Sequence, residues 1–148
     1  MIGKSNIEEI IERDGAFVST ISGYSMSPML KDRRDTVVVS RITGEIKKYD
    51  VILYRTGEKY ILHRVIKVKE KEYITCGDNC TVLEIVPKES VIGILTEAWQ
   101  GETKLDLKSR KYRSYCKRKV AAIYPRKAYR GARGIAVNVA KKIIKKRR

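Results

Sequence analysis

Ser25, in the stretch SGYSMSPML, has a side chain that can act as a nucleophile. A serine hydroxyl attacks a peptide carbonyl only when a neighbouring base takes its proton and when hydrogen-bond donors stabilise the developing oxyanion. Gly23 and Pro28 on either side favour a tight backbone turn. Because a serine in such a turn is also ordinary turn chemistry, its role depends on the other residues of the chain.

His63 is the only histidine of the chain, and it lies in YILHRVIKV. The alternation in this stretch predicts a half-buried strand in which Ile61, His63 and Val65 share one face. Imidazole readily accepts a proton near neutral pH, so His63 is the candidate general base for Ser25. A lone histidine in a strand is also commonly structural, and the strand pattern alone does not separate the two roles.

Asp78, in TCGDNC, offers a carboxylate after the next predicted hairpin. A Gly-Asp-Asn sequence is favourable turn chemistry in its own right. A serine–histidine pair, however, uses a carboxylate that orients the imidazole ring. We therefore treat Ser25, His63 and Asp78 as a candidate catalytic unit.

The three cysteines, Cys76, Cys80 and Cys116, cannot all pair within the chain, so we expect reduced thiols. The spacing of Cys76 and Cys80 would suit zinc, but a structural zinc site needs four ligands. Only Cys116 and His63 remain to complete such a set. We therefore expect no metal and no cofactor.

The elements that must position these residues are predominantly strands. Segments rich in β-branched and aromatic residues alternate with polar or glycine-bearing turns, which predicts a mainly β fold with an antiparallel sheet. Hairpins are expected in VILYRTGEKYILHRV and VIKVKEKEYIT. Before the strands, SNIEEIIERDG predicts a short amphipathic helix that is capped by Ser5 or Asn6 and ends at Gly15.

The net charge of +16 is unevenly distributed along the chain. Residues 1–100 contain 15 Lys/Arg and 15 Asp/Glu, whereas residues 101–148 contain 18 Lys/Arg and 2 Asp/Glu. This break predicts a neutral β domain at residues 1–104 and a basic, helical C-terminal extension at residues 105–148.

Two short basic helices are expected in the C-terminal extension, because apolar residues recur there at helical spacing. Pro125 interrupts the pattern, and Ile135, Val139 and Ile143 continue it at four-residue intervals. No segment approaches the run of about 20 apolar residues that a membrane-spanning helix needs. The N-terminus is too acidic for a secretory signal, so we expect a cytoplasmic protein, soluble or peripheral to a membrane.

Four stretches, SGYSMSPML, YDVILYR, YILHRVIKV and YITCGDN, resemble in that order the conserved boxes of type I signal peptidases and of the related self-cleaving SOS repressors. The likeness runs from about Gly15 to Leu95. It implies a signal-peptidase-like β domain with Ser25 as the nucleophile. His63 followed by Arg-Val is similar to the histidine-type signal peptidases of archaea, the endoplasmic reticulum and some spore-forming bacteria, which use histidine where other members use lysine.

The resemblance implies two carboxylates near the histidine. One is Asp78 of the Gly-Asp-Asn box, and the other lies six residues further on, where this chain has Glu84. Which of them orients His63 stays open at this point. Bacterial members use a serine hydroxyl two residues before the nucleophile as an oxyanion donor, but that position is Gly23 here. The Ser25 backbone N–H is therefore expected to be one donor, and the second is unassigned.

Two functions follow as hypotheses. The first is a serine endopeptidase that cleaves a leader or signal-type segment from a precursor peptide, since only 24 residues precede Ser25 and they hold neither a membrane anchor nor a self-cleavage site of the repressor type. The second is a non-enzymatic β domain whose basic extension binds nucleic acid through interleaved tyrosines and basic residues. The first is favoured because the candidate catalytic residues are all present.

The partner expected for the basic extension is an anionic membrane surface. Its charge stands beside short apolar stripes, which suits a helix that lies at an interface. Nucleic acid would attract the same charge and is the less favoured partner.

Overall fold

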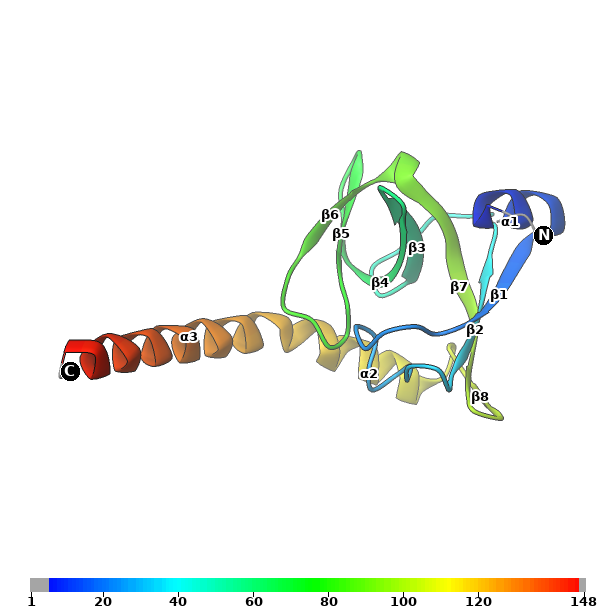
Figure 1. Cartoon of the computed structure of the whole chain (residues 1–148). Helices are drawn as coiled ribbons and strands as arrows, with labels where there is room; N and C mark the ends of the chain where they lie inside the picture. Colours follow the sequence, from blue (N-terminus) through cyan, green and yellow to red (C-terminus); the bar gives the residue numbers. More distant parts are fainter. Residues whose placement is uncertain (1–5, 147–148) are drawn as a thin grey trace, which may run out of the picture.

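The computed structural model describes residues 6–146, with side chains up to residue 136 (Figure 1). The described strands form one antiparallel sheet in the order β1-β2-β7-β3-β4-β5-β6, with β8 paired to β7. The mainly β, antiparallel fold expected from the sequence is confirmed. The strands are β1 (Ala16–Thr20), β2 (Thr36–Ser40), β3 (Val51–Thr56), β4 (Lys59–Val68), β5 (Glu72–Cys76), β6 (Glu84–Pro87), β7 (Val91–Gln100) and β8 (Thr103–Leu105).

Both predicted hairpins form, because β3 pairs with β4 and β4 pairs with β5. The short 3-10 helix η1 (Lys88–Ser90) then leads into β7, which pairs with both β2 and β3. This insertion of a late strand between two earlier ones joins β1 and β2 to the hairpins. It is a non-local pairing that no turn signal in the sequence predicts.

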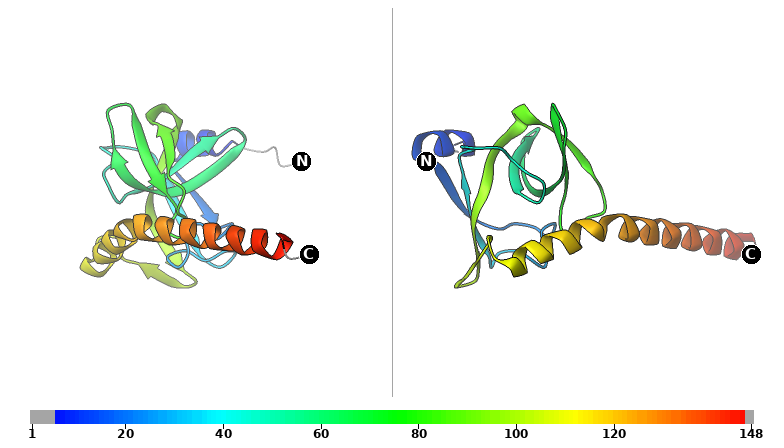
Figure 2. Two further views of the ribbon diagram at one scale, coloured as in Figure 1. Left: turned by 90° about the vertical axis from the view of Figure 1, so that its left-hand side faces the viewer. Right: turned by 180° about the vertical axis from the view of Figure 1, so that it is seen from behind.

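The sheet is curled, as the two views in Figure 2 show, and the main apolar core packs against strands β2, β3 and β7. The loop between β1 and β2 contributes Met26, Met29 and Leu30 to this core, so the segment around Ser25 is packed against the sheet. Burial of these side chains fixes the loop to the strands. The buried members of the core are Ile11, Met26, Met29, Leu30, Val37, Val39, Val51, Leu53, Leu95 and Ala98.

The predicted N-terminal helix is α1 (Ile7–Asp14), and Gly15 ends it in the left-handed conformation at φ 81°. Asn6 occupies the N-cap position, but its side chain does not cap the helix. Its Oδ1 instead accepts a hydrogen bond from the Tyr60 hydroxyl on β4. Ser5, the other predicted cap, lies outside the described residues.

Two helices follow the sheet: α2 (Arg110–Ala121) and α3 (Ile123–Lys146). The Ser109 hydroxyl caps α2 by accepting the Tyr112 N–H at 3.0 Å. The two helices are separated at Ala122, three residues before Pro125. A proline is tolerated in the first turn of a helix but not in its interior, so α3 begins just before Pro125. At 24 residues, α3 is longer than the short helix expected, and the side chains of Val139 and Ile143 lie outside the described part.

The packed part of the molecule extends beyond residue 104, the end of the β domain expected from the sequence. Cys116, Val120 and Ile123 of the two helices are all buried, and Val120 and Ile123 form a cluster with Ile66 of β4 and Cys76 of β5. Beyond them, α3 projects away from the sheet (Figure 1). Neither α3 nor any other described helix has the length and apolar character of a membrane span.

Candidate active site

Ser25 lies in the loop between β1 and β2, and its neighbours hold the loop in place from two sides. Met26 and Met29 are buried in the core beneath it. Gly23 adopts φ 97°, a left-handed conformation that favours glycine, and its N–H donates to Asp32 Oδ1 at 2.7 Å. The glycine and methionine neighbours of Ser25 therefore shape and anchor its turn.

Asp35 fastens the far end of the same loop. Its carboxylate is fully buried and accepts the Lys31 N–H at 2.8 Å, the Gly101 N–H at 3.0 Å and the Arg34 Nε–H at 2.5 Å. Burial alone would raise the pKa of Asp35, but the hydrogen bonds from Arg34 and the two backbone N–H groups outweigh it and leave the pKa lowered. This carboxylate ties the Ser25 loop to the β7–β8 turn.

His63 lies on β4 and contacts Glu84, the first residue of β6. His63 Nδ1 is 2.7 Å from Glu84 Oε2, and their side chains are 10% and 36% exposed. The Tyr54 hydroxyl on β3 donates to the same Glu84 oxygen and lies 3.2 Å from His63 Nδ1 and 3.3 Å from Thr75 Oγ1 on β5. Burial and the neighbouring Glu84 carboxylate raise the pKa of Tyr54. Four adjacent strands thus each supply one polar side chain to this cluster.

Ser25 and His63 line one pocket of about 350 Å³. The backbone of Ser25 and the ring of His63 both lie close to Gly77. A Cβ added at Gly77 would lie 2.6 Å from Ser25 O and 3.1 Å from His63 Nε2. Both atoms therefore lie against the same bare Cα, where no larger residue fits. His63 presents Nδ1 to Glu84 and Nε2 to the side on which Ser25 lies.

The residues after Gly77 hold the Ser25 turn directly. The Asn79 N–H donates to Ser25 O at 2.8 Å, and Asn79 Nδ2 donates to Tyr24 O at 3.3 Å. The Gly-Asp-Asn turn is therefore packed against the nucleophile candidate, although β5 and the β1–β2 loop are far apart in sequence.

Asp78 lies in this turn but binds a different partner from Glu84. Arg64 Nε and Nη2 donate to its two carboxylate oxygens at 2.7 Å and 2.8 Å, and the Tyr115 hydroxyl of α2 donates to Oδ2 at 2.8 Å. Among the described residues, Asp78 makes no hydrogen bond to His63. Of the two carboxylates left open by the sequence, Glu84 contacts the imidazole and Asp78 forms a buried ion pair with the adjacent Arg64.

Arg64 is fully buried beneath α2. Its Nη1 donates to Tyr49 O at 2.9 Å and to the Tyr112 hydroxyl and Cys116 Sγ at 3.1 Å each. Burial alone would lower the pKa of Arg64, but the hydrogen bonds and charge of Asp78 outweigh it and raise the pKa. The guanidinium therefore stays charged and joins β4, the Gly-Asp-Asn turn and α2.

Arg126 completes this connection from α3. Its Nη1 donates to the backbone oxygen of Asp78 at 2.8 Å. Sequence reasoning did not identify Arg64, Tyr115, Arg126 or Tyr54. Strand alternation gives a signal for Arg64, because it places Arg64 on the other face of the strand from His63. The neighbouring residues on that face are apolar, so a buried charge there needs a partner.

Two strand edges without a strand partner flank the pocket. Among the described strands, β1 pairs only with β2, so its other edge is free. On β4, pairing with β5 begins at Arg64, which leaves the edge of residues 59–63 free on that side. Residues from both edges line the pocket, so an extended chain entering it would find backbone donors and acceptors on two sides.

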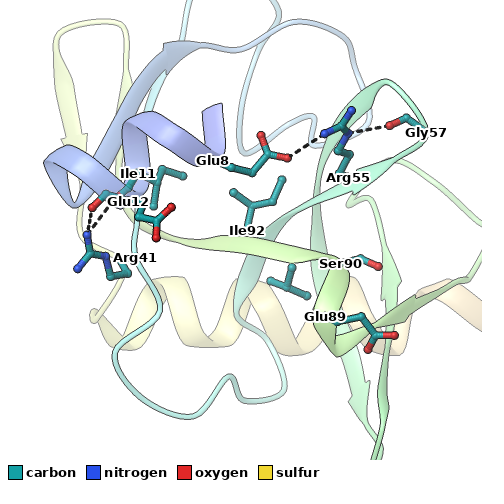
Figure 3. A pocket seen from close by; sticks show the side chains of 10 residues that line it. Glu8, Ile11, Glu12, Arg41, Arg55, Gly57, Glu89, Ser90 and Ile92 are labelled. Carbon is teal, nitrogen blue, oxygen red and sulfur yellow. Dashed lines mark hydrogen bonds and ion pairs between the residues drawn. The ribbon is translucent and has the colours of Figure 1, made fainter. Parts of the chain in front are cut away.

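A second hollow, with a volume of about 740 Å³, lies between α1, η1 and the β3–β4 turn (Figure 3). Arg55 pairs with Glu8 across it, and Arg41 donates to the backbone oxygens of Ile11 and Glu12 at the end of α1. These contacts attach α1 to the sheet. None of the four predicted site residues lines this hollow.

Cys76, Cys80 and Cys116 are free thiols, as the odd number suggested. Burial raises the pKa of the Cys76 thiol to about 11, which leaves it protonated and unreactive near neutral pH. Among the described residues, no three His, Cys, Asp or Glu side chains are grouped as a metal centre requires.

Comparison with known proteins finds no family model that matches the chain and no curated protein with a significant sequence match.

Proposed function

We propose that this protein is a serine endopeptidase of the signal-peptidase type, with Ser25 as nucleophile, His63 as general base and Glu84 as the carboxylate that orients the base. One observation carries the proposal. His63 has Glu84 on Nδ1 at 2.7 Å, and its Nε2 lies beside the Ser25 turn in a shared pocket. A carboxylate on one side of the imidazole and the Ser25 turn on the other support this assignment of the three roles that acyl transfer by serine needs.

The tautomer of His63 follows from its contact with Glu84. A carboxylate beside Nδ1 favours a proton on that nitrogen, which leaves Nε2 free to accept the Ser25 hydroxyl proton. Ser25 Oγ then attacks the peptide carbonyl, and the protonated His63 returns the proton to the leaving amine. Water hydrolyses the resulting acyl-enzyme by the same route, while Glu84 stabilises the transient imidazolium.

The Ser25 N–H supports the proposal as an oxyanion donor. Among the described residues it donates to no acceptor, whereas the neighbouring Gly23 and Ser27 N–H groups are both bound. A backbone donor held by a packed turn stabilises developing negative charge without reorganising.

The pocket favours an extended substrate with small or medium apolar side chains. Strand addition between β1 and residues 59–63 would align a peptide past Ser25. The apolar lining from Phe17, Val37 and Leu53 is suited to such side chains. A leader or signal-type segment of a precursor peptide has this character, and we propose it as the substrate class.

The test is cleavage of a mixed peptide library, read by mass spectrometry, together with labelling by a serine-directed fluorophosphonate probe. We expect cleavage after small residues, lost in both Ser25→Ala and His63→Ala. The double variant should be no slower than either single one, because the two residues act as a unit. Cleavage that persists in Ser25→Ala would refute the assignment. A wild-type chain that neither cleaves nor labels would favour the non-enzymatic binding module.

A further inference from the structure

The helix α3 leaves the molecule with an unpartnered surface. Ile123 at its start is buried and Arg126 is half-buried, but every side chain from residue 127 to 136 is exposed. Figure 1 and the right-hand view of Figure 2 show the helix extending away from the sheet. Three large side chains of α3, Tyr124, Tyr129 and Ile135, are 62%, 65% and 68% exposed.

The exposed part of α3 has two chemically different faces. Tyr124, Ala128, Ala132 and Ile135 are separated by four, four and three residues, so they share one face of an α-helix. The opposite face carries Arg126, Arg130 and Arg133, and Gly134 lies on this basic side between Arg130 and Lys127. An apolar stripe of this kind on a solvated helix indicates a binding surface, since nothing in the described chain covers it.

The charge of this segment restricts the partner. Every charged residue after Asp106 is a lysine or an arginine. A second copy of α3 would bring two basic helices together without any acidic residue to pair them, which disfavours self-association. Charge complementarity therefore favours an anionic partner.

The apolar face decides between the two kinds of anionic partner. A nucleic acid neutralises basic side chains through its phosphates and can stack a base on Tyr124, but it would leave the aliphatic side chains of the stripe, such as Ile135, in water. The surface of an anionic bilayer offers headgroup charge and an apolar layer side by side, so it covers both faces of such a helix at once.

We propose that α3 binds in the plane of an anionic membrane, with the face of Tyr124, Ala128, Ala132 and Ile135 at the acyl boundary and the basic side chains among the headgroups. This proposal rests on the surface of α3 and is independent of the proposed peptidase activity. Arg126 connects the base of the helix to the Asp78 turn, so docking would place the Ser25 pocket near the membrane surface.

The test is co-sedimentation of the full chain with vesicles of pure phosphatidylcholine and with vesicles that also contain phosphatidylserine, at one salt concentration. Two variants add the same charge on different faces: Ile135→Glu on the apolar face and Gly134→Glu on the basic face. We expect binding to the phosphatidylserine vesicles alone. Ile135→Glu should weaken it by about tenfold or more, and Gly134→Glu by about twofold, because only the first places a charge at the acyl boundary.

Circular dichroism of both variants shows whether the helix is kept, and a glutamate in place of glycine should not reduce helicity. Equal weakening by the two variants would refute the apolar-face contact. Failure of the wild type to bind phosphatidylserine vesicles would refute the proposal, and tight binding of a short RNA in that same case would assign the helix to nucleic acid.

Discussion

His63 and Arg64 are consecutive residues of one strand, and each has its own carboxylate. Strand alternation sends the two side chains to opposite faces, where His63 meets Glu84 and Arg64 meets Asp78. The Glu84 side chain is partly exposed and can change without leaving a buried charge. Asp78 is buried and neutralises a buried guanidinium. The two carboxylates therefore differ in what their loss should do.

We predict that Glu84→Gln lowers kcat/KM by about 10²–10⁴-fold, because the imidazole loses the partner that sets its tautomer and stabilises its charged form. The thermal melting point should change little. Asp78→Asn should instead destabilise the fold by about 3–5 kcal/mol, because it leaves Arg64 buried and unpaired. Peptide cleavage assays and urea unfolding of both variants test this division. A stable Asp78→Asn chain that has lost activity would reverse the roles.

Gly77 gives a second prediction at the residue scale. A Cβ there would lie 2.6 Å from Ser25 O and 2.9 Å from Cys80 Sγ, so Gly77→Ala must displace the turn that supports Ser25. We expect a loss of kcat of about tenfold or more, since small misplacements of reacting groups are costly. Gly44→Ala is the matched control, because a Cβ at Gly44 meets nothing within 4 Å. Similar activity in the two variants would contradict the close approach.

At the scale of elements, the β1–β2 loop depends on Asp35. The folded-state pKa of Asp35 is lowered, so its stabilising contribution is present above the pKa of an unfolded aspartate, about 3.9, and is lost as the pH falls through the folded value. We predict that Asp35→Asn destabilises the protein by about 1–3 kcal/mol at neutral pH. The variant should also lose less stability than the wild type on acidification.

Urea unfolding between pH 7 and acid, with the exposed Glu58→Gln as control, measures this effect. The prediction fails if Asp35→Asn and the wild type have parallel stability curves across the acid range.

The local elements were largely predictable from the sequence, and the long-range ones were not. Alternation in YILHRVIKV identified β4, and Gly15 identified the end of α1, because both signals act within a few residues. The placement of β7 between β2 and β3 depends on pairing between distant segments. For the candidate site, the sequence points to Ser25, His63 and the two carboxylates. The partner of each carboxylate depended on sheet order, so it could not be read from spacing.

At the scale of the whole molecule, the charge break near residue 100 does not coincide with a break in packing. The basic segment contains α2, which is buried against Arg64, and the exposed part of α3, which is not. The distribution of charge along the sequence does not show which part of the basic segment packs against the sheet. The boundary expected at residue 104 therefore separates two segments that pack together.

We predict that a chain ending at residue 128 keeps the melting temperature of the full protein, whereas a chain ending at residue 104 does not fold cooperatively. The shorter chain loses the buried side chains of Cys116, Val120 and Ile123 and exposes the buried ion pair of Arg64. Thermal unfolding followed by circular dichroism distinguishes them. A cooperative transition in the shorter chain at the temperature of the full protein would show that α2 is dispensable.

Tyr115 and Arg126 donate hydrogen bonds to Asp78, so the turn that contains Asp78 is completed only after both residues have been synthesised. A chain leaves the ribosome from its N-terminus, so Ser25, His63 and Glu84 emerge before α2 and the start of α3. Until those helices arrive, the turn that supports Ser25 lacks its outer contacts. The nascent β sheet is therefore an incomplete enzyme under the proposed function, and it gains its catalytic geometry only when the basic segment has been made.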